Sequence, residues 1–335
     1  MRQGKLALLV GTLLGGIAMS GAEAAEAIKI GIVKTTASGG LFVAQEKGYF
    51  AAENLAVEIV GFDAAQIATQ ATMAGDVDIG ATALSAAFYN LAAKGGLKLI
   101  GGLAREVPGF HGTAFLATNR AWDAGLTALK GLEHHSIAVP QIGGPLHYEV
   151  ALIAEKYGLD IRTMRLLPLQ TVPNVATAII GGQPDAGLVP STQAVQMTDR
   201  GQAHLLGWVG DETPWQISAI FVATKNAATR RPMIEAFLRG YRKGARDYYD
   251  AVAGPGGKRQ DGPTAPAILS IVAKNLDQTP AQVSLAAGYV DPDAKLDVKD
   301  VLHQVAWFKA QGMIPADANG PDMIDKRYVA PLAGG

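Results

Sequence analysis

Cysteine is absent from this chain of 335 residues. Disulfide bonds, thiolate nucleophiles and cysteine-ligated metal sites are therefore excluded. The same absence excludes a lipid anchor attached to a cysteine behind an export signal. We expect no covalent attachment to a membrane, and we also predict no metal and no cofactor.

Charge of one sign and long apolar runs are also scarce. The 29 Lys and Arg residues nearly balance the 30 Asp and Glu residues, and the formal net charge is −1. No block of like charge stands out, so neither nucleic acid nor a charged membrane surface is predicted as a partner. Beyond the N-terminal region no segment reaches the ~18 uninterrupted apolar residues of a membrane-spanning helix, and we expect a soluble mature protein.

The N-terminus has the pattern of a secretory signal peptide. Arg2 and Lys5 precede an apolar run from Leu6 to Ala18, and small residues follow in SGAEAAEA at 20–27. The alternative is a membrane anchor, but the run is shorter than the roughly 20 residues that cross a bilayer. The sequence predicts a signal peptide over residues 1–25, with a cleavage motif at 22–24 or 25–27, and a periplasmic location.

Apolar segments of strand length alternate with segments of helical length along most of the chain. Strands are predicted at 28–33, 55–62, 77–82, 97–104, 135–140, 164–169 and 185–190, and helices at 41–54, 64–76, 84–96, 145–159 and 172–184. The C-terminal third is mainly helical, beginning with an amphipathic segment at 230–252. This alternation predicts an α/β protein with mostly parallel sheets flanked by helices, and the chain length favours two lobes.

A short internal repeat supports two lobes of similar construction. The segments ATMAGDVDIGAT at 71–82 and AIIGGQPDAGLV at 178–189 share Ala, Gly, Asp and Gly at the same spacing. One interpretation is chance similarity among small residues. The other is that each lobe contains a helix, a glycine stop, an aspartate and then a strand directed toward a common cleft.

Several segments together resemble a known family. GGLFVAQEKGYFAAENLAVEIV at 39–60, AGDVDIGATALSAA at 74–87 and RPMIEAFLRGYRKGARDYY at 231–249 resemble periplasmic substrate-binding proteins of ABC importers. The group includes sulfonate, taurine and nitrate binders and the NMT1/THI5-like proteins. The resemblance implies a two-lobed periplasmic-binding-protein fold of type II, with two hinge crossings near 112–118 and 218–224. Lobe 1 would comprise 28–112 plus 219–335, and lobe 2 would comprise 113–218.

Candidate ligand-binding residues follow from the rule that ligands in open α/β sheets lie beyond the carboxyl ends of the strands. Four such ends carry hydroxyl groups, glycines or helix starts, which suit an anion without a buried lysine. Thr82 or Ser85 could instead be only a helix N-cap. The candidates at these four turns are Thr35, Thr36, Ser38, Gly39, Thr82, Ala83, Ser85, Gln141, Gly143, Gly144, Pro190 and Ser191.

Cationic and aromatic candidates complete the set. Arg105, His111 and His147 lie at candidate strand ends and could pair with an anionic ligand, although the alternative for each is a solvated surface residue, as is usual for Lys and Arg. Trp215 could close over the ligand or could pack in the core. The predicted ligand is a small organic anion of the sulfonate or carboxylate type, with nitrate and pyrimidines as alternatives.

The resemblance implies a monomeric, non-catalytic protein that delivers its solute to a membrane permease. A sensory protein that uses the same cleft is one alternative, and an enzyme is the other. Pyrimidine synthases of the same fold carry a cysteine-rich metal motif, which this chain cannot form. The sequence also contains no G-x-S-x-G, H-E-x-x-H or P-loop motif.

Overall fold

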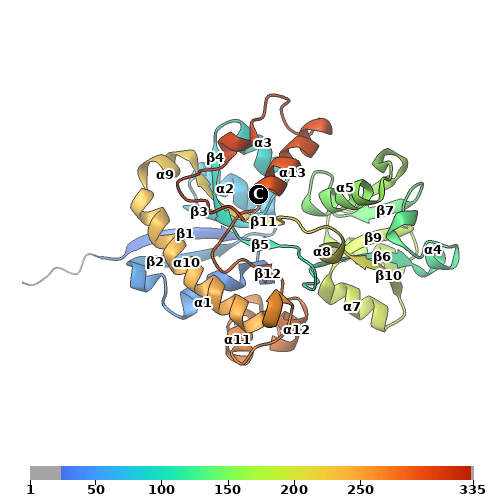
Figure 1. The fold of residues 1–335 in the computed structure, drawn as a ribbon, viewed down its shortest axis with the longest axis horizontal. Coiled ribbons are helices and arrows are strands. Elements are labelled where there is room, and N and C mark those ends of the chain that lie inside the picture. The colour runs from blue at the N-terminus through green and yellow to red at the C-terminus, as the bar shows by residue number, and fades with distance from the viewer. Residues whose placement is uncertain (1–23, 333–335) are drawn as a thin grey trace, which may run out of the picture.

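The computed structural model describes residues 24–332, and most of the predicted signal peptide, residues 1–25, lies outside the described residues. Two five-stranded sheets form two lobes that lie side by side (Figure 1). Lobe 1 is built on the order β2-β1-β3-β11-β4, and lobe 2 on the order β10-β6-β9-β7-β8. The α/β, two-lobed class expected from the sequence is therefore confirmed.

The strands of lobe 1 are β1 (Glu26–Ile32), β2 (Leu55–Gly61), β3 (Ile79–Ala83), β4 (Leu97–Gly102) and β11 (Ser218–Ala223). Those of lobe 2 are β6 (Thr113–Thr118), β7 (Ser136–Val139), β8 (Arg165–Pro168), β9 (Ala186–Pro190) and β10 (Ala203–Trp208). A small separate sheet pairs β5 (Ala104–Arg105) with β12 (Tyr289–Val290).

Helices cover both sheets (Figure 1). In lobe 1 they are α1 (Gly39–Glu46), α2 (Ala65–Ala74), α3 (Ala86–Ala93), α9 (Thr224–Thr229), α10 (Arg231–Val252), α11 (Ala265–Leu276), α12 (Pro280–Leu285) and α13 (Val298–Ala310). In lobe 2 they are α4 (Asn119–Asp123), α5 (Pro145–Tyr157), α6 (Val172–Ile180), α7 (Ser191–Asp199) and α8 (Val209–Glu212). Within residues 24–332, no helix combines the length and the apolar character needed to cross a bilayer.

Each sheet is mostly parallel, with one reversed strand. In lobe 1, β1, β2 and β3 run parallel, and only β11 runs against its neighbours β3 and β4. In lobe 2, β6 is the reversed strand, between β9 and β10. Each reversed strand directly follows a segment that passes from one lobe to the other.

The predicted crossings at 112–118 and 218–224 are wrong in position. Nearly all of these residues form β6 and β11, which are buried inside the sheets, and the linking segments are residues 106–112 and 213–217. A strand covered on both faces shows no alternation of apolar and polar residues, so its sequence alone does not separate it from a buried linker. The proposed lobe boundaries at 112/113 and 218/219 remain a prediction.

The internal repeat corresponds to a repeated structure. Gly75 and Gly182 take φ angles of 89° and 67° and follow α2 and α6. Asp78 accepts a hydrogen bond from the backbone N–H of Lys29 at 2.7 Å, and Asp185 accepts one from Ser136 at 2.8 Å. Each aspartate therefore joins the start of its strand to a neighbouring parallel strand, β1 in lobe 1 and β7 in lobe 2. The repeat is a shared local construction of the two lobes, but of the two strands only β3 is followed by a turn that lines the cavity described below.

One predicted helix is shorter than expected. The pattern at 41–54 predicts a continuous helix, but α1 ends at Glu46. Gly48 adopts a φ of 72°, which lies in the left-handed region that terminates helices. The break lets the chain turn back into β2, whose residues pair with β1 along their whole length.

Candidate functional site

A cavity of about 740 Å³ lies between the two lobes. Lobe 1 contributes the turns after β1, β2 and β3, and lobe 2 contributes the turns after β7 and β8. Most of the lining residues lie within the segments 33–38, 63–66, 81–87, 140–146 and 170–173, and Leu103, Ile217 and Ser218 complete the wall. The carboxyl ends of strands from both lobes therefore meet at one hollow, as the rule for open α/β sheets predicts.

Eight of the candidate residues line this cavity. They belong to three of the four predicted turns and supply hydroxyl groups, an amide and glycines: Thr35, Ser38, Thr82, Ala83, Ser85, Gln141, Gly143 and Gly144. The structure thus brings together residues that are up to about a hundred positions apart in the chain.

Thr82 and Ser85 differ in their hydrogen bonding. Ser85 is the N-cap of α3, and its hydroxyl oxygen accepts a hydrogen bond from the N–H of Phe88 at 3.3 Å. Thr82 is 4% exposed, lines the cavity, and its hydroxyl has no hydrogen-bond partner among the described residues. Because buried hydroxyl groups normally have a partner, Thr82 is the polar side chain most clearly left for a ligand.

The other four candidates from the predicted turns do not line the cavity. The Thr36 hydroxyl donates a hydrogen bond to the carbonyl of Ala286 at 2.7 Å. Gly39 packs so closely on α10 that a Cβ there would lie 2.5 Å from the Tyr248 ring. Pro190 pairs with Thr113 in the sheet, and the Ser191 N–H donates to the carbonyl of Gly112 at 2.8 Å. These four residues serve the packing of the lobes instead.

The cationic candidates also lie elsewhere. Arg105 forms an ion pair with Asp297 at 2.8 Å. His111 stacks on Trp208 with ring centroids 4.4 Å apart and contacts Asp211 at 3.2 Å. Neither residue lines the cavity, so the expectation that they pair with an anionic ligand is not supported by their positions.

His147 and Trp215 are structural. The Nδ1 atom of His147 accepts a hydrogen bond from the N–H of Gly143 at 3.0 Å, and burial lowers the pKa of His147 to about 4. A neutral His147 therefore fixes the turn before α5. Trp215 is completely buried against Tyr148, with ring centroids 5.2 Å apart. Of the two roles considered for Trp215, the structure shows packing in the core.

The sequence reasoning missed two turns of the cavity. Asp63 and Gln66 come from the turn after β2, and Gln170 and Thr171 from the turn after β8. Both turns follow strands that were predicted, so applying the strand-end rule to every strand would have found them. Asp63 is the one charged side chain among the residues that line the cavity.

Helix starts surround the cavity and provide its positive electrostatic character. The first residues of α2, α3, α5 and α6 all belong to the lining. Ser85 and Thr171 cap α3 and α6 with their own side chains, and α5 begins with Pro145, which has no N–H group. The start of α2 follows Ala64 and has no side-chain cap. A ligand at this site would meet partial positive charge without meeting a cationic side chain.

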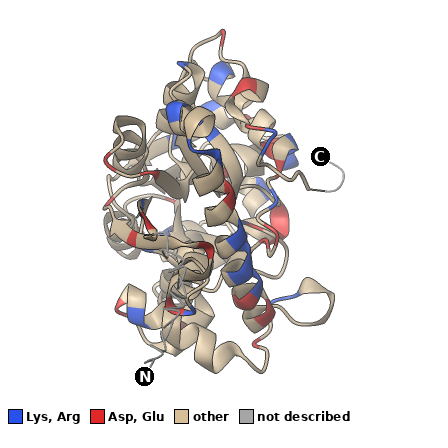
Figure 2. Ribbon diagram, turned by 90° about the vertical axis from the view of Figure 1, so that its left-hand side faces the viewer, with Lys and Arg blue, Asp and Glu red and all other residues tan. Residues whose placement is uncertain are grey.

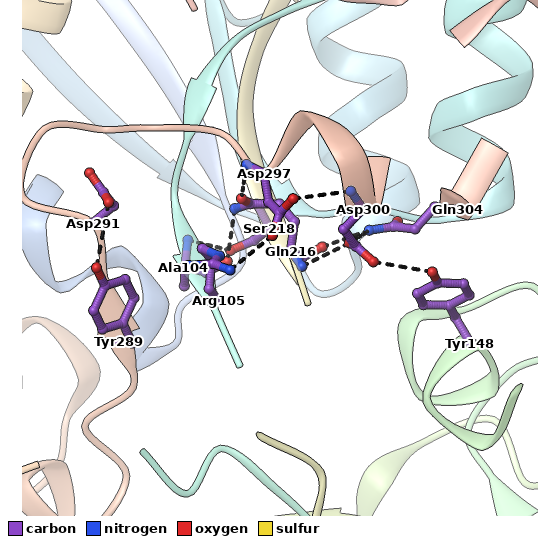
Figure 3. A network of polar contacts seen from close by, with 10 residues as sticks. All are labelled: Ala104, Arg105, Tyr148, Gln216, Ser218, Tyr289, Asp291, Asp297, Asp300 and Gln304. Carbon is purple, nitrogen blue, oxygen red and sulfur yellow. Dashed lines mark hydrogen bonds and ion pairs between the residues drawn. The ribbon is translucent and has the colours of Figure 1, made fainter. Parts of the chain in front are cut away.

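The lobes touch beside the cavity. The N–H of Ala86, at the start of α3, donates a hydrogen bond to the carbonyl of Gly143 in lobe 2 at 2.9 Å. Farther along the interface, the Tyr148 hydroxyl donates to Asp300 at 3.2 Å, and Asp300 accepts from the N–H of Gln216 at 2.9 Å (Figure 3). The cavity is therefore closed on one side by direct contacts between α5 of lobe 2 and lobe 1.

Charged side chains are of mixed sign over the whole molecule. Blue and red segments are interspersed in the view of Figure 2. The basic stripe on α10 is compensated locally, since Arg239 and Lys243 pair with Glu53 at 2.7 and 3.0 Å, and Arg246 pairs with Asp293. These cations hold α10 against the rest of lobe 1.

Solved structures share this fold over nearly the whole chain. The alkanesulfonate-binding protein SsuA of Xanthomonas axonopodis pv. citri bound to MOPS is 19% identical, with a TM-score of 0.67 over 91% of this chain and 99% of that one. The periplasmic aliphatic sulphonate-binding protein SsuA of Escherichia coli is 17% identical, with a TM-score of 0.71 over 92% and 94%. The periplasmic nitrate-binding protein NrtA of Synechocystis PCC 6803 is 11% identical, with a TM-score of 0.65 over 90% and 86%.

At these identities the likeness shows the fold, and it confirms the periplasmic-binding-protein architecture expected from the resemblance. No curated protein matches the chain by sequence. A family model described as NMT1/THI5 like matches residues 35–252, which is more than half of the 335-residue chain. The chain therefore belongs to the NMT1/THI5-like family.

Proposed function

We propose that this protein is the solute-binding component of an ABC importer, and that it captures a small organic solute between its lobes and delivers it to a membrane permease. The observation that carries the proposal is a cavity built from strand ends of both lobes. A solute there contacts both lobes only when they are closed, so binding favours the closed state. The N-terminal signal pattern supports a periplasmic location.

The lining also indicates the kind of solute. Alanine, valine, leucine, isoleucine and proline side chains form most of the wall, which suits an apolar body. The Thr82 hydroxyl and the start of α3 suit a group that accepts hydrogen bonds. Each helix start stabilises a nearby anion by about 0.3–1 kcal/mol. Together with the Thr82 hydroxyl they favour an anionic group, and we propose a sulfonate or carboxylate group on an apolar body.

A thermal-shift panel tests the function directly. The panel contains sulfonates, carboxylates and neutral amides that carry the same apolar groups, so that only the polar group differs between them. Nitrate and pyrimidines are also included. A bound solute present at about 100 times its Kd stabilises the protein by about 2.7 kcal/mol. We expect a shift with organic sulfonates or carboxylates and quantitative recovery of the unmodified solute. Chemical conversion of the solute, or no shift with any member, would contradict the proposal.

Thr82 is expected to contribute directly to affinity. Thr82→Val keeps the shape of the side chain but removes the hydroxyl, and we expect it to weaken binding of the solute found in the panel by about ten-fold. The free energy of unfolding should not fall, because the hydroxyl has no partner in the protein. Thr82→Ser is the matched control and should retain affinity. Calorimetry measures both, and equal affinity of the Val and Ser variants would remove Thr82 from the site.

Asp63 is expected to oppose an anionic solute. Asp63→Asn removes the one charged side chain of the lining, and we expect anionic solutes to bind about three-fold more tightly as repulsion across a solvated distance is lost. The neutral amides of the panel should bind unchanged. Asp76→Asn, at the exposed far end of α2, is the control and should have no effect. Weaker binding of anions by the Asp63 variant would show that Asp63 holds the solute.

A further inference from the structure

Helix α5 of lobe 2 packs along α13 of lobe 1. Beside the cavity, the ring of His147 lies 5.1 Å from that of Trp307, and a Cβ on Gly143 would lie 3.6 Å from the sulfur of Met313. Farther from the cavity, the ring of Tyr148 also contacts Trp307, with centroids 5.4 Å apart. The two helices therefore form a contact between the lobes that begins at the turn lining the cavity.

Helix α13 is fixed to lobe 1 by contacts of its own. The Tyr89 hydroxyl on α3 donates a hydrogen bond to Oε1 of Gln304 at 2.9 Å, and the ring of Tyr89 lies 5.7 Å from that of Phe308. The Gln304 amide donates to the carbonyl of Gln216 in the second linking segment at 2.9 Å. We therefore expect α13 to stay with lobe 1 when the lobes separate, so that its contacts with α5 are lost.

Four polar side chains form a chain of contacts between these two helices. Oε2 of Glu155 lies 3.1 Å from Nε2 of His303, and Nδ1 of His303 lies 2.6 Å from the Tyr148 hydroxyl. The same hydroxyl lies 3.2 Å from Oδ1 of Asp300, as Figure 3 shows. Each of the three contacts joins the lobes, because Glu155 and Tyr148 belong to α5 whereas His303 and Asp300 belong to α13.

Three contacts of this kind need three hydrogens. With both carboxyl groups ionised and the imidazole neutral, the chain holds only two, one on His303 and one on Tyr148. One contact then sets two acceptors against each other. A single added proton supplies the third hydrogen, and it completes the chain whether it binds His303 or Asp300. In either case each contact has one donor and one acceptor.

The surroundings of Asp300 favour uptake of that proton. Burial raises the pKa of Asp300 to about 6, with Asp297 adding to the effect and hydrogen bonds from Gln304 and Gln216 opposing it. Its second oxygen, Oδ2, is already occupied by the N–H of Gln216 at 2.9 Å and the amide of Gln304 at 2.7 Å. Burial also raises the pKa of Tyr148 far above its usual range, so its hydroxyl keeps its hydrogen.

The other charged groups near the chain do not supply the missing hydrogen. Beside Asp300 on α13, Asp297 forms its ion pair with Arg105 of β5 at 2.8 Å. On α5, Lys156 is engaged with Glu212 of α8. Glu149, which follows Tyr148, is fully buried toward the start of β6. The balance of donors and acceptors between α5 and α13 therefore depends on a proton taken from solvent.

We propose that Glu155, His303, Tyr148 and Asp300 form a clasp between α5 and α13 that is complete only when it holds one additional proton, so that acidic pH favours the closed lobes. With that proton, every contact joins a donor on one lobe to an acceptor on the other. Without it, two acceptors face each other, and water satisfies them better than the opposite helix does. The proposal rests on the lobe closure contained in the proposed function.

Distance measurements between the lobes test the clasp without a solute. Because the chain has no cysteine, Gln70→Cys on α2 and Thr177→Cys on α6 place two spin labels at exposed positions, one in each lobe. Double electron–electron resonance is recorded from about pH 5.5 to about pH 8, a range in which histidine and a carboxyl group with a raised pKa lose their protons. We expect the population with the longer separation to grow about three-fold as pH rises. Circular dichroism at each pH confirms that the protein stays folded.

The substitution Asp300→Asn separates the clasp from a purely structural role. The amide nitrogen can donate to Tyr148 while the amide oxygen still accepts from Gln216 and Gln304, so the chain holds three hydrogens at every pH. We expect closed lobes and no pH response. Tyr148→Phe keeps the ring but removes two contacts, and we expect more of the longer separation at every pH. Glu58→Gln, at a glutamate whose side chain is 64% exposed on β2, should behave as the parent.

Three results would overturn the clasp. The first is a parent protein with two separations whose populations do not respond to pH, which leaves lobe closure in place. The second is a pH response that either Asp300→Asn or Tyr148→Phe retains. The third is an Asp300→Asn variant whose lobes separate at acidic pH. A single separation under all conditions, including with each sulfonate and carboxylate of the panel, would contradict lobe closure itself and the clasp with it.

Discussion

Gly143→Val is expected to lower the affinity for the solute by about a hundred-fold or more, equivalent to at least about 2.7 kcal/mol. Gly143 has a φ of 77°, and a Cβ there would lie 3.1 Å from the Cβ of Ala86 in lobe 1. Its carbonyl accepts the hydrogen bond from the N–H of Ala86 at 2.9 Å that joins the lobes beside the cavity. A branched side chain at this point separates the two surfaces that closure must bring together.

Gly158→Val is the control for backbone strain. Gly158 follows α5 with a φ of 65°, and no other atom lies within 4 Å of the Cβ position. Both variants place a β-branched residue in the left-handed region and so share a similar conformational cost. Calorimetric titration should therefore show normal affinity for Gly158→Val and a large loss for Gly143→Val. Equal affinities would show that the turn at 141–144 does not close on the solute.

The buried glutamates are expected to make the protein less stable as pH rises above neutrality. Burial raises the pKa of Glu149 well above its ordinary value and that of Glu106 to about 7. The folded protein therefore holds protons that the unfolded chain releases at about pH 4.5. For an acid with a raised pKa, the stabilisation is complete below the unfolded pKa and is lost as pH rises through the folded pKa. Between about pH 6.5 and 8.5 we expect a loss of about 2 kcal/mol.

Urea denaturation across this range measures the effect. His147 affects stability in the opposite direction at lower pH, because burial lowers its pKa to about 4. The stability that neutral His147 contributes is lost as pH falls below about 6.5 toward this value. Urea denaturation measured only between about pH 6.5 and 8.5 therefore reports on the glutamates without a contribution from His147. Glu149→Gln should flatten the pH dependence, while the exposed Glu58→Gln should leave it unchanged. A parent protein of constant stability above pH 6.5 would show that the pair is not protonated when folded.

Sequence reasoning found the turns of the site better than the roles of its residues. The turns after β1, β3 and β7 were predicted from hydroxyls, glycines and helix starts, and all three line the cavity. The turn after β9, with Pro190 and Ser191, satisfied the same rule but packs against the first linking segment. Position at the end of a strand is a local property, whereas exposure to the cleft depends on how the second lobe is set against the first.

The cationic candidates show the same limit. Arg105 and His111 occupy the kind of position from which a side chain can reach a ligand, but Asp297 and Asp211, which come from distant parts of the chain, lie beside them. A long charged side chain pairs with the nearest opposite charge, and that neighbour is defined only by the assembled fold. The same holds for Trp215 of the second linking segment, whose indole packs on Tyr148 of lobe 2.

The sequence by itself determined the alternation of strands and helices, the two lobes and the repeated Gly–Asp–Gly construction that starts β3 and β9. These features follow from hydrophobic periodicity and from glycines with positive φ, which act over a few residues. Only the tertiary structure decided where the linkers run, that Asp63 is the charge in the cavity, and that Glu106 and Glu149 are buried. Those outcomes depend on burial and on contacts between residues far apart in sequence, and no local pattern encodes either one.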